Sequence, residues 1–279
     1  MNSNLCNYED FLTNDYEKFC ELIHEKKRIH RKQWEFYVIY ENIKKHVKSF
    51  DGKKGLGFAV GSEVIVPLFV KLGANVTASD LDPNDPSSVA WANTNQHMSN
   101  GFNKYFDGYI KKMLFENKCE FKYINMNNIP LDLNGYDFIW SSCALEHLGS
   151  IKLGLEFIEK SLACLKPGGV AVHTTEFNYL SNDDTLETPG CVCFRKKDIE
   201  QIVTKLSHKG YSVEIINYDR HKNIVNDHVD EFPYNGSQHA IFFEIQNYDV
   251  MKSHINIKLD KYVSTSIYLV IKKPLNLKK

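Results

Sequence analysis

A glycine-rich turn and an acidic residue downstream of it are the first features of this sequence that could bind a ligand. The turn Gly55-Leu-Gly57-Phe-Ala59-Val-Gly61 joins a short apolar segment to a segment with helical spacing. Glycines at such a turn let the backbone approach a ligand closely, with the start of a helix behind it. Asp80 follows the next predicted strand, 19 residues after Gly61. A carboxylate there can accept hydrogen bonds from both ribose hydroxyls of an adenosine, so the pair predicts a nucleoside-cofactor site.

Two classes of nucleoside cofactor fit such a site, namely nicotinamide dinucleotides and S-adenosylmethionine. The dinucleotide-binding pattern is G-x-G-x-x-G, and Val60 stands where its third glycine belongs. The turn therefore favours S-adenosylmethionine. A tight turn can also require glycine without any ligand, so this structural alternative stays open.

Two polar segments, Ser141–His147 and His173–Asn178, follow or end the fourth and fifth predicted strands. Ligands bind at the carboxyl ends of the strands in doubly wound folds. His147 and His173 could each act as a general base on a hydroxyl group, and Glu146 and Glu176 could orient them or bind the substrate. Two alternatives stay open: His147 could only cap the next helix, and His173 could be a satisfied core histidine. The polarity of His173–Asn178 argues against the second alternative, because a buried fifth strand should be apolar.

The elements that must position these residues alternate between strands and helices. The predicted strands are Gly55–Val60, Asn75–Ser79, Cys119–Asn125, Tyr136–Ser141, Val170–Thr175, Ser212–Tyr218 and Tyr262–Ile271. The predicted helices are one or two over residues 12–48, Ser62–Leu72 with Ser62 as its N-cap, Ser87–His97, Ser150–Leu165 and Lys196–His208. This order predicts an α/β fold with a doubly wound, mostly parallel sheet. The last two strands have no clear helix between them, which predicts an antiparallel hairpin at one edge.

The domain organisation follows from the same pattern. Residues 1–50 are predicted to form an N-terminal helical extension, and residues 51–279 the α/β domain. Residues 219–261 are aromatic and irregular. A structureless stretch of that length favours a lid over the site, a substrate contact or a contact between copies of the chain.

Composition excludes several classes of protein. The chain has 279 residues, of which 43% are hydrophobic, and a formal net charge of −1. Near neutrality gives no electrostatic reason to expect a nucleic acid or an anionic membrane as partner. The seven scattered cysteines are odd in number, which is typical of reduced thiols and predicts a cytoplasmic protein. We see no secretory signal and no apolar run near the ~20 residues that a membrane span needs.

Together, these segments resemble a class I S-adenosylmethionine-dependent methyltransferase. The matching features are Gly57-x-Ala59-x-Gly61, Asp80-Leu-Asp-Pro83, Tyr136-Asp-Phe-Ile-Trp-Ser-Ser, Leu145-Glu-His-Leu148 and Leu165-Lys-Pro-Gly-Gly169. More narrowly, the chain resembles a bacterial subfamily found with surface-polysaccharide biosynthesis genes. This closer match rests on HRKQWE (30–35), WANTNQH (91–97), SSCALEHLGS (141–150), HTTEFN (173–178) and YVSTSIYLVIKK (262–273). The resemblance covers residues 28–273 and implies a Rossmann-like, seven-stranded sheet with the last strand antiparallel.

The resemblance also implies a set of cofactor-binding residues. They are Gln33, Trp34, Gly57, Phe58, Ala59, Gly61, Asp80, Leu81, Asn125, Met126 and Ser142. Three positions depart from the family pattern. Gly55 stands where many class I enzymes carry an acidic residue, Ala59 replaces the middle glycine, and Asn125 replaces a common aspartate. An amide oxygen can still accept a hydrogen bond, so these changes concern affinity and not the class of protein.

The resemblance implies methyl transfer to an oxygen of a sugar or sugar-nucleotide acceptor in surface-polysaccharide biosynthesis. One alternative is methylation of a phosphoramidate or phosphoryl oxygen of a capsule, and another is a catalytically silent partner protein that keeps the cofactor fold. His147, His173, Glu176 and His254 could together bind a divalent metal. Their spacing matches no recognised motif, so we expect S-adenosylmethionine and do not expect a metal. We expect no nucleic-acid or membrane partner, and a homo-oligomer is compatible with the sequence.

Overall fold

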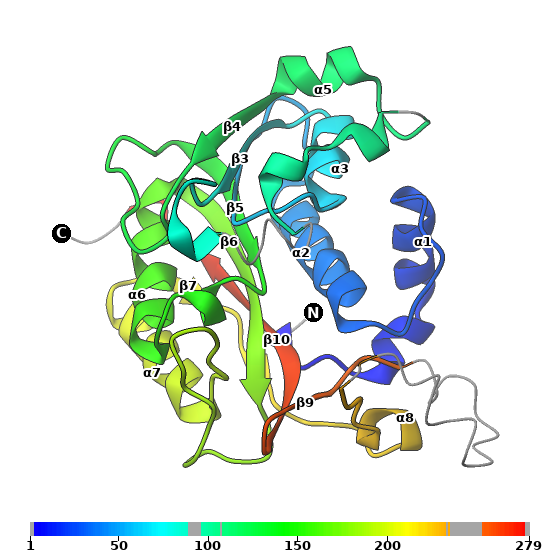
Figure 1. Cartoon of the computed structure of the whole chain (residues 1–279). Helices are drawn as coiled ribbons and strands as arrows, with labels where there is room; N and C mark the ends of the chain where they lie inside the picture. Colours follow the sequence, from blue (N-terminus) through cyan, green and yellow to red (C-terminus); the bar gives the residue numbers. More distant parts are fainter. Residues whose placement is uncertain (1–2, 89–95, 107, 233, 235–252, 277–279) are drawn as a thin grey trace.

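The computed structural model of this chain describes residues 3–88, 96–106, 108–232, 234 and 253–276. A single large β-sheet runs through the molecule between two layers of helices (Figure 1). The α-helices are α1 (Asn14–Leu22), α2 (Arg31–Val47), α3 (Ile65–Lys71), α5 (Lys112–Lys118), α6 (Ile151–Ser161), α7 (Lys196–His208) and α8 (Ile224–Asp227). Short 3-10 helices cover Tyr8–Leu12, Pro86–Ser88, Met98–Asn100, Asn103–Tyr105, Leu145–His147 and Leu162–Cys164. Helices α2 and α3 lie on one face of the sheet, and α6 and α7 lie on the other.

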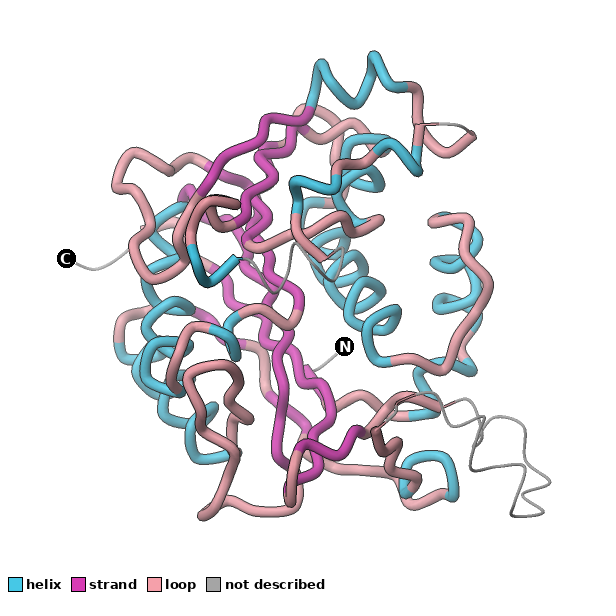
Figure 2. The backbone as a smooth tube through the Cα atoms, viewed as in Figure 1, coloured by secondary structure: helices cyan, strands magenta, loops and turns pink. Residues whose placement is uncertain are grey.

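The sheet has the predicted mixed order. Its strands, in spatial order, are β4 (Cys119–Tyr123), β3 (Asn75–Asp80), β2 (Lys54–Phe58), β5 (Tyr136–Ser142), β6 (Leu165–Asn178), β10 (Tyr262–Lys272) and β7 (Ser212–Val213). The pairs from β4 to β6 are parallel, whereas β10 is antiparallel to both β6 and β7. Figure 2 shows the strands in magenta as one twisted layer. The predictions of a doubly wound α/β sheet and of an antiparallel last strand are therefore confirmed.

One predicted strand divides into two short pieces. Of the stretch Ser212–Tyr218, only β7 joins the large sheet, and β8 (Ile216–Asn217) pairs in parallel with β1 (Ser3–Asn4). A further strand, β9 (Ile257–Leu259), pairs with the start of β10. The N-terminus thus adds a two-stranded sheet beside the main one, which the sequence pattern did not indicate.

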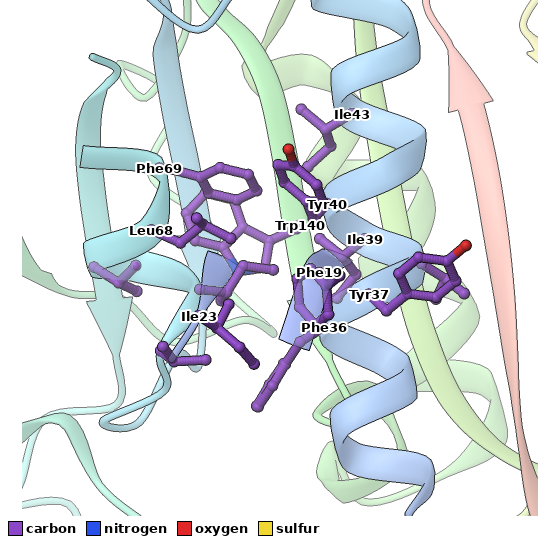
Figure 3. Close-up of a cluster of buried hydrophobic side chains, with 14 of the residues drawn as sticks. Phe19, Ile23, Phe36, Tyr37, Ile39, Tyr40, Ile43, Leu68, Phe69 and Trp140 are labelled. Carbon is purple, nitrogen blue, oxygen red and sulfur yellow. The ribbon is translucent and has the colours of Figure 1, made fainter. Parts of the chain in front are cut away.

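Two hydrophobic cores lie on the two faces of the sheet, because a parallel sheet covered by helices is apolar on both sides. On the α2–α3 face, the Phe69 ring lies 5.0 Å from the rings of Phe138 and Trp140, measured between centroids. Figure 3 shows Phe69 and Trp140 beside the side chains of α2. On the other face, Phe58 of β2 packs edge-on against Phe157 of α6, at 5.1 Å. The two cores hold the strand ends, and hence the site, in a fixed position.

Helix α2 is part of this packing. It contacts β5, β6 and β10, and 10 of its 17 residues are buried, so it lies inside the fold. The predicted helix over 62–72 starts later than expected, at Ile65, and no side chain caps it. Ser62 is therefore not its N-cap, and its carbonyl oxygen instead accepts a hydrogen bond from the Tyr105 hydroxyl at 3.1 Å.

Some predictions fall on residues that the structure does not describe. The predicted helix Ser87–His97 lies mostly in 89–95, outside the described residues, and so does Trp91 of the WANTNQH segment. Of residues 219–261, the described part contains α8 and β9, and a role of this region as a lid or contact surface stays a prediction. In the described part of the chain, no helix has the length and apolarity to cross a membrane.

Candidate functional site

A cavity of about 550 Å³ lies at the carboxyl ends of β2, β3, β4 and β5. These ends meet at one edge because the four strands are parallel. Of the residues predicted to bind a cofactor, the cavity is lined by Ala59, Gly61, Asp80, Leu81, Asn125, Met126 and Ser142. His147 lines it too, together with further residues, among them Glu25, Lys32, Phe36, Ser62, Glu63, Gln96, Lys104, Tyr105 and Cys143. Gln33, Trp34, Gly57 and Phe58 do not line it.

Gly57 and Phe58 serve packing. A Cβ atom on Gly57 would lie only 2.4 Å from the Trp140 ring, so the sheet face requires glycine here without any ligand. Phe58 is fully buried in the core on the α6 face. The Phe58 side chain therefore points away from the cavity, and a contact of the cofactor with the backbone of Gly57 or Phe58 stays a prediction.

The second half of the glycine turn does reach the cavity. Ala59 and Gly61 have φ values of +47° and +52°, in the left-handed region. A Cβ on Gly61 would lie 2.3 Å from the Gln96 carbonyl oxygen, so a close approach of two chain segments requires this glycine. Gly55 has a similar explanation, since a Cβ there would lie 2.4 Å from the Phe138 ring. An acidic side chain at position 55 is thus excluded by packing.

Asp80 is fixed at the end of β3 by the backbone. Its Oδ1 accepts a hydrogen bond from the Leu81 N–H and its Oδ2 one from the Met98 N–H, both at 2.9 Å. The carboxylate is 8% exposed and lines the cavity. Each carboxylate oxygen has more than one lone pair, so Asp80 can still accept hydrogen bonds from a ligand.

Asn125 follows β4 in the same way. Its Oδ1 accepts a hydrogen bond from the Asn127 N–H at 2.9 Å, which fixes the side chain in a turn. Its neighbours Ile124 and Met126 give the cavity an apolar wall, and both are largely buried. A wall of this kind suits a flat, weakly polar ring with one polar edge.

Lys32 and Glu63 form an ion pair in the wall of the cavity. Lys32 Nζ lies 3.0 Å from Glu63 Oε1 and donates hydrogen bonds to the Ser142 carbonyl oxygen at 3.0 Å and hydroxyl at 3.1 Å. Burial raises the pKa of Glu63 to about 7. Glu63 Oε2 is buried and has no hydrogen-bond partner among the described residues. An orphaned carboxylate oxygen of this kind is rare and points to a ligand.

Gln33 and Trp34, predicted to close over a cofactor, lie on the far side of α2. The Gln33 amide holds the preceding loop by accepting from the Arg28 N–H at 2.8 Å and donating to the Lys26 carbonyl at 3.1 Å. The Trp34 indole N–H donates to Asp10 Oδ2 at 2.8 Å. Both are fully buried. Neither side chain lines the cavity, whereas Lys32 and Phe36 of the same helix do.

Of the three predicted catalytic residues, only His147 lines the cavity. It ends the 3-10 turn Leu145–His147, and its Nδ1 lies 2.8 Å from the Gly190 carbonyl oxygen. A carbonyl oxygen can only accept, so Nδ1 carries a hydrogen, and in the neutral imidazole the lone pair is on Nε2. His147 can therefore act as a base at the cavity wall.

His173 lies in the core, as the structural alternative required. Its Nδ1 lies 2.8 Å from the Ser141 hydroxyl, its Nε2 lies 3.3 Å from the Ser161 hydroxyl, and its ring packs against Phe157. Burial lowers its pKa to about 3. The predicted role of His173 as a general base is therefore corrected: its ring faces α6, on the side of the sheet away from the cavity.

Side chains from three of the segments that carried the closer family resemblance form one largely buried group, and hydroxyls of a fourth segment bind it. We call this group, which comprises Arg31, Glu35, Cys143, Glu146 and Glu176, the polar cluster. Glu35 and Glu146 are fully buried and Glu176 is 5% exposed. Arg31 comes from HRKQWE, Cys143 from SSCALEHLGS and Glu176 from HTTEFN, while hydroxyls of the YVSTSIYLVIKK segment on β10 bind the carboxylates.

The three carboxylates of the polar cluster differ in how well they are satisfied. Glu35 accepts hydrogen bonds from four side chains, those of Ser142, Cys143, Thr174 and Ser266. Glu176 pairs with Arg31 at 2.5 Å and accepts from the Ser264 hydroxyl. Glu146 has one donor, the Thr175 hydroxyl at 2.9 Å on Oε2, and its Oε1 has no partner among the described residues.

The pKa directions follow these differences. Burial by itself raises the pKa of Glu35, but the Lys32 and Arg31 cations and the donated hydrogen bonds hold it below its ordinary value. Burial raises the pKa of Glu146 above its ordinary value, and the nearby Glu176 adds to this. Burial and the same carboxylates raise the pKa of the Cys143 thiol.

The predicted metal ligands His147, His173, Glu176 and His254 do not come together. His254 Nδ1 lies 2.6 Å from Asp230 Oδ2, and its ring stacks on that of His30 at 4.4 Å. Among the described residues, the one group of three side chains whose donor atoms lie within 4.8 Å of one another is Cys143, Glu146 and Glu176. Of the four predicted ligands, only Glu176 belongs to this group, and a metal ion bound there stays a prediction.

Comparisons with known proteins agree on the fold. No family model matches the chain, and no curated protein matches it. Among solved structures, the chain is similar to phosphoethanolamine N-methyltransferase 2 of Haemonchus contortus, in complex with phosphomonomethylethanolamine and S-adenosylhomocysteine. The TM-score is 0.51 at 14% identity, over 96% of this chain and 60% of that one. The chain therefore has the Rossmann-like fold of such methyltransferases.

Two bacterial structures are also similar. An S-adenosylmethionine-dependent methyltransferase from Mesorhizobium loti matches with a TM-score of 0.44 and 11% identity, over 84% of this chain and 97% of that one. TehB from Haemophilus influenzae matches with a TM-score of 0.46 and 14% identity, over 84% and 62%.

Proposed function

We propose that this protein is a cytoplasmic S-adenosylmethionine-dependent methyltransferase that acts on an oxygen of a small carbohydrate-related acceptor in surface-polysaccharide biosynthesis. The observation that carries the proposal is the set of polar groups that line one cavity at the carboxyl ends of the parallel strands. These groups are Asp80, Asn125 and the Lys32–Glu63 pair. The cavity's volume of about 550 Å³ is in the range of small-molecule sites.

The cavity residues fit the two polar ends of this cofactor. The Asp80 carboxylate suits two ribose hydroxyls, and the Asn125 side chain next to the apolar wall suits the adenine edge. The amino-acid end of the cofactor carries an ammonium and a carboxylate, and Glu63 and Lys32 offer one group of each opposite charge. Glu63 Oε2, which has no partner among the described residues, is the atom that such an ammonium would satisfy. Glu63 thus supplies the acidic group that packing excludes at Gly55.

When bound, S-adenosylmethionine supplies a methyl group that an acceptor oxygen takes in line, while the electron pair of the broken C–S bond stays on sulfur. The chain's own residues must hold the acceptor and receive its proton. We assign the proton to His147 Nε2, because Nδ1 is oriented by the Gly190 carbonyl oxygen. Ser142 and Cys143, at the end of β5, form the wall between the cavity and the polar cluster.

The polar cluster favours a hydroxyl acceptor over an anion. It holds three carboxylates and one guanidinium, and Arg31 is already paired with Glu176. The negative charge of these carboxylates would disfavour a phosphoramidate or phosphoryl anion in the adjoining cavity, whereas an uncharged sugar hydroxyl would not be repelled. We therefore favour methylation of a sugar or sugar-nucleotide hydroxyl.

Calorimetric titration with S-adenosylhomocysteine, beside a nicotinamide dinucleotide control, tests the cofactor. We expect one-to-one binding of the first compound alone. Transfer of tritium from methyl-labelled S-adenosylmethionine to a panel of UDP- and GDP-hexoses and inorganic phosphoramidate then tests the acceptor. Binding without transfer to any hexose would contradict the proposed acceptor. Failure to bind S-adenosylhomocysteine would contradict the enzyme itself and favour the silent-partner alternative.

A further inference from the structure

We propose that Cys143, Glu146 and Glu176 bind a divalent transition-metal ion of the zinc type at the inner wall of the cavity. One donor atom from each of the three side chains lies within 4.8 Å of the others. Glu146 is fully buried, and its Oε1 has no hydrogen-bond partner among the described residues. A buried carboxylate oxygen without a donor requires a ligand that supplies positive charge or hydrogen bonds.

The donor set matches zinc-type chemistry. One thiolate and two carboxylates are ligands that a borderline ion accepts together, whereas Mg²⁺ and Ca²⁺ avoid sulfur. Ionised, the three ligands carry three negative charges, which a divalent ion and the Arg31 guanidinium balance. Arg31 lies 2.5 Å from Glu176 and 3.9 Å from Cys143 Sγ, so it can neutralise the excess charge beside the ion.

The surroundings hold the ligands in place. The Thr175 hydroxyl donates to Glu146 Oε2 at 2.9 Å, and the Ser264 hydroxyl donates to Glu176. Hydrogen bonds of this kind orient metal ligands and are typical of built sites. The Cys143 thiol donates a hydrogen bond to Glu35 Oε1 at 2.9 Å, which orients the sulfur within the polar cluster.

The backbone gives the site its opening. Cys143 has a φ of +44°, which is uncommon for a residue other than glycine. This conformation is held by the Cys143 N–H, which donates to the carbonyl and hydroxyl oxygens of Thr174. Cys143 lines the cavity while its thiol reaches Glu35 in the polar cluster. Cys143 is the one proposed ligand that lines the cavity, so the proposed ion would be reached from the cavity beside its sulfur, and three protein ligands would leave a coordination position for another molecule, as in catalytic zinc sites.

The role of the ion rests on the proposed methyl transfer. At the open position it would bind the acceptor hydroxyl and lower its pKa, so that His147 takes the proton more easily. The existence of the site does not depend on that role, and it can be tested without an acceptor.

Titration of the chelator-treated full-length protein with Co²⁺ alone tests the site, because a cobalt–thiolate bond has a charge-transfer absorption band in the near ultraviolet. We expect this band to rise to a one-to-one endpoint, and added Zn²⁺ to remove it. Cys143→Ser should abolish the band. Glu146→Gln should weaken Co²⁺ binding by more than the roughly 10–100-fold lost when only a residue hydrogen-bonded to a ligand is removed.

Cys191→Ser is the matched control, since Cys191 lies in the same region but outside the group of three. It should keep the band, and each variant should still bind S-adenosylhomocysteine, which shows that it is folded. The proposal is overturned if no thiolate band forms, or if the band survives Cys143→Ser and is lost in Cys191→Ser. Neither result bears on the proposed function, because that function is tested separately by the binding of S-adenosylhomocysteine.

Discussion

The cavity and the polar cluster adjoin each other at Cys143, yet they are built in different ways. In the cavity, Asp80 and Asn125 are fixed by backbone N–H groups of their own or neighbouring loops. In the polar cluster, Glu35 and Glu176 are fixed by side chains from α2, β6 and β10. Removing one cavity side chain leaves the backbone that holds it intact. Removing one member of the polar cluster leaves buried charges without partners.

This difference predicts separate consequences for affinity and stability. Substitutions in the cavity should mainly change the binding of ligands, because the loop conformation is held by main-chain contacts. Substitutions in the polar cluster should also lower the free energy of unfolding, since a buried carboxylate that loses its partner is strongly unfavourable. His147 lines the cavity, but its proposed role concerns the proton of the acceptor. Its replacement should therefore change neither the affinity for the cofactor product nor the free energy of unfolding.

The largest effect should come from His147. His147→Asn removes the proposed proton acceptor and should lower the rate of methyl transfer by about 10²–10⁴-fold, the usual contribution of general base catalysis. The affinity for S-adenosylhomocysteine should stay unchanged. Steady-state rates with the hexose found by the tritium assay check this.

The paired variant is His173→Asn, in the core. Its rate should stay within a few-fold of the wild type, because His173 faces α6 and not the cavity. If His173→Asn lost more activity than His147→Asn, the assignment of the base would be wrong.

The next effect is on stability. Arg31→Met removes the guanidinium that pairs with Glu176 and leaves that carboxylate buried. Breaking a buried pair in this way should lower the free energy of unfolding by about 3–5 kcal/mol, measured by urea denaturation. Lys205→Met, which breaks an exposed pair with Glu159, should cost at most about 1 kcal/mol. Equal losses would mean that the polar cluster is no more dependent on side chains than the surface.

A smaller effect is expected at Asp80. Asp80→Ala removes the carboxylate proposed to bind the ribose, and hydrogen bonds to charged groups contribute about 1.5–3 kcal/mol each. The affinity for S-adenosylhomocysteine should therefore fall in calorimetry by at least the roughly 10–100-fold that one such hydrogen bond represents. The free energy of unfolding should change less than in Arg31→Met. Unchanged affinity would exclude Asp80 from the cofactor site.

The two regions also differ in how far the sequence could predict them. The sheet order, the turn at Gly61 and the positions of Asp80 and Asn125 follow from strand ends in a parallel sheet, so local patterns were sufficient. Glu63 was not predicted as a site residue, because its place in the cavity wall depends on an ion pair with Lys32, which lies on another element. Gly57 is required by packing against Trp140. A glycine pattern in the sequence does not show whether a glycine is needed for packing or for contact with a ligand.

The error at His173 has a simple physical cause. Successive residues of a strand point to opposite faces of the sheet, so the polar segment 173–178 divides between two environments. Thr174 and Glu176 meet residues of α2, whereas His173 meets Phe157 of α6. The sequence indicated that the segment was unusually polar, but not whether its odd-numbered or its even-numbered residues lie on the face of the sheet next to the site. The grouping of the polar cluster was missed for a related reason, since its members come from α2, the turn after β5, and β6, so that Arg31 and Glu176 lie 145 residues apart in the sequence (176 − 31).

The last prediction separates the two ends of the proposed cofactor. Burial raises the pKa of Glu63 to about 7, and only the ionised carboxylate attracts an ammonium. Protonation of Glu63 as the pH falls should therefore weaken S-adenosylhomocysteine binding, by up to about tenfold per pH unit below that pKa. Binding of 5′-methylthioadenosine, which lacks the amino-acid end, should not change with pH in this way.

Glu63→Gln should remove this pH dependence and lower the affinity for S-adenosylhomocysteine at alkaline pH by about tenfold, which corresponds to about 1.4 kcal/mol. Its affinity for 5′-methylthioadenosine should equal that of the wild type, and Glu156→Gln on the surface of α6 should change neither. Parallel losses for both compounds would instead assign Glu63 to holding the cavity wall through Lys32. In that case Lys32 and Glu63 would fix each other in the cavity wall, as the side chains of the polar cluster do. The distinction between a cavity held by the backbone and a cluster held by side chains would then fail at the Lys32–Glu63 pair.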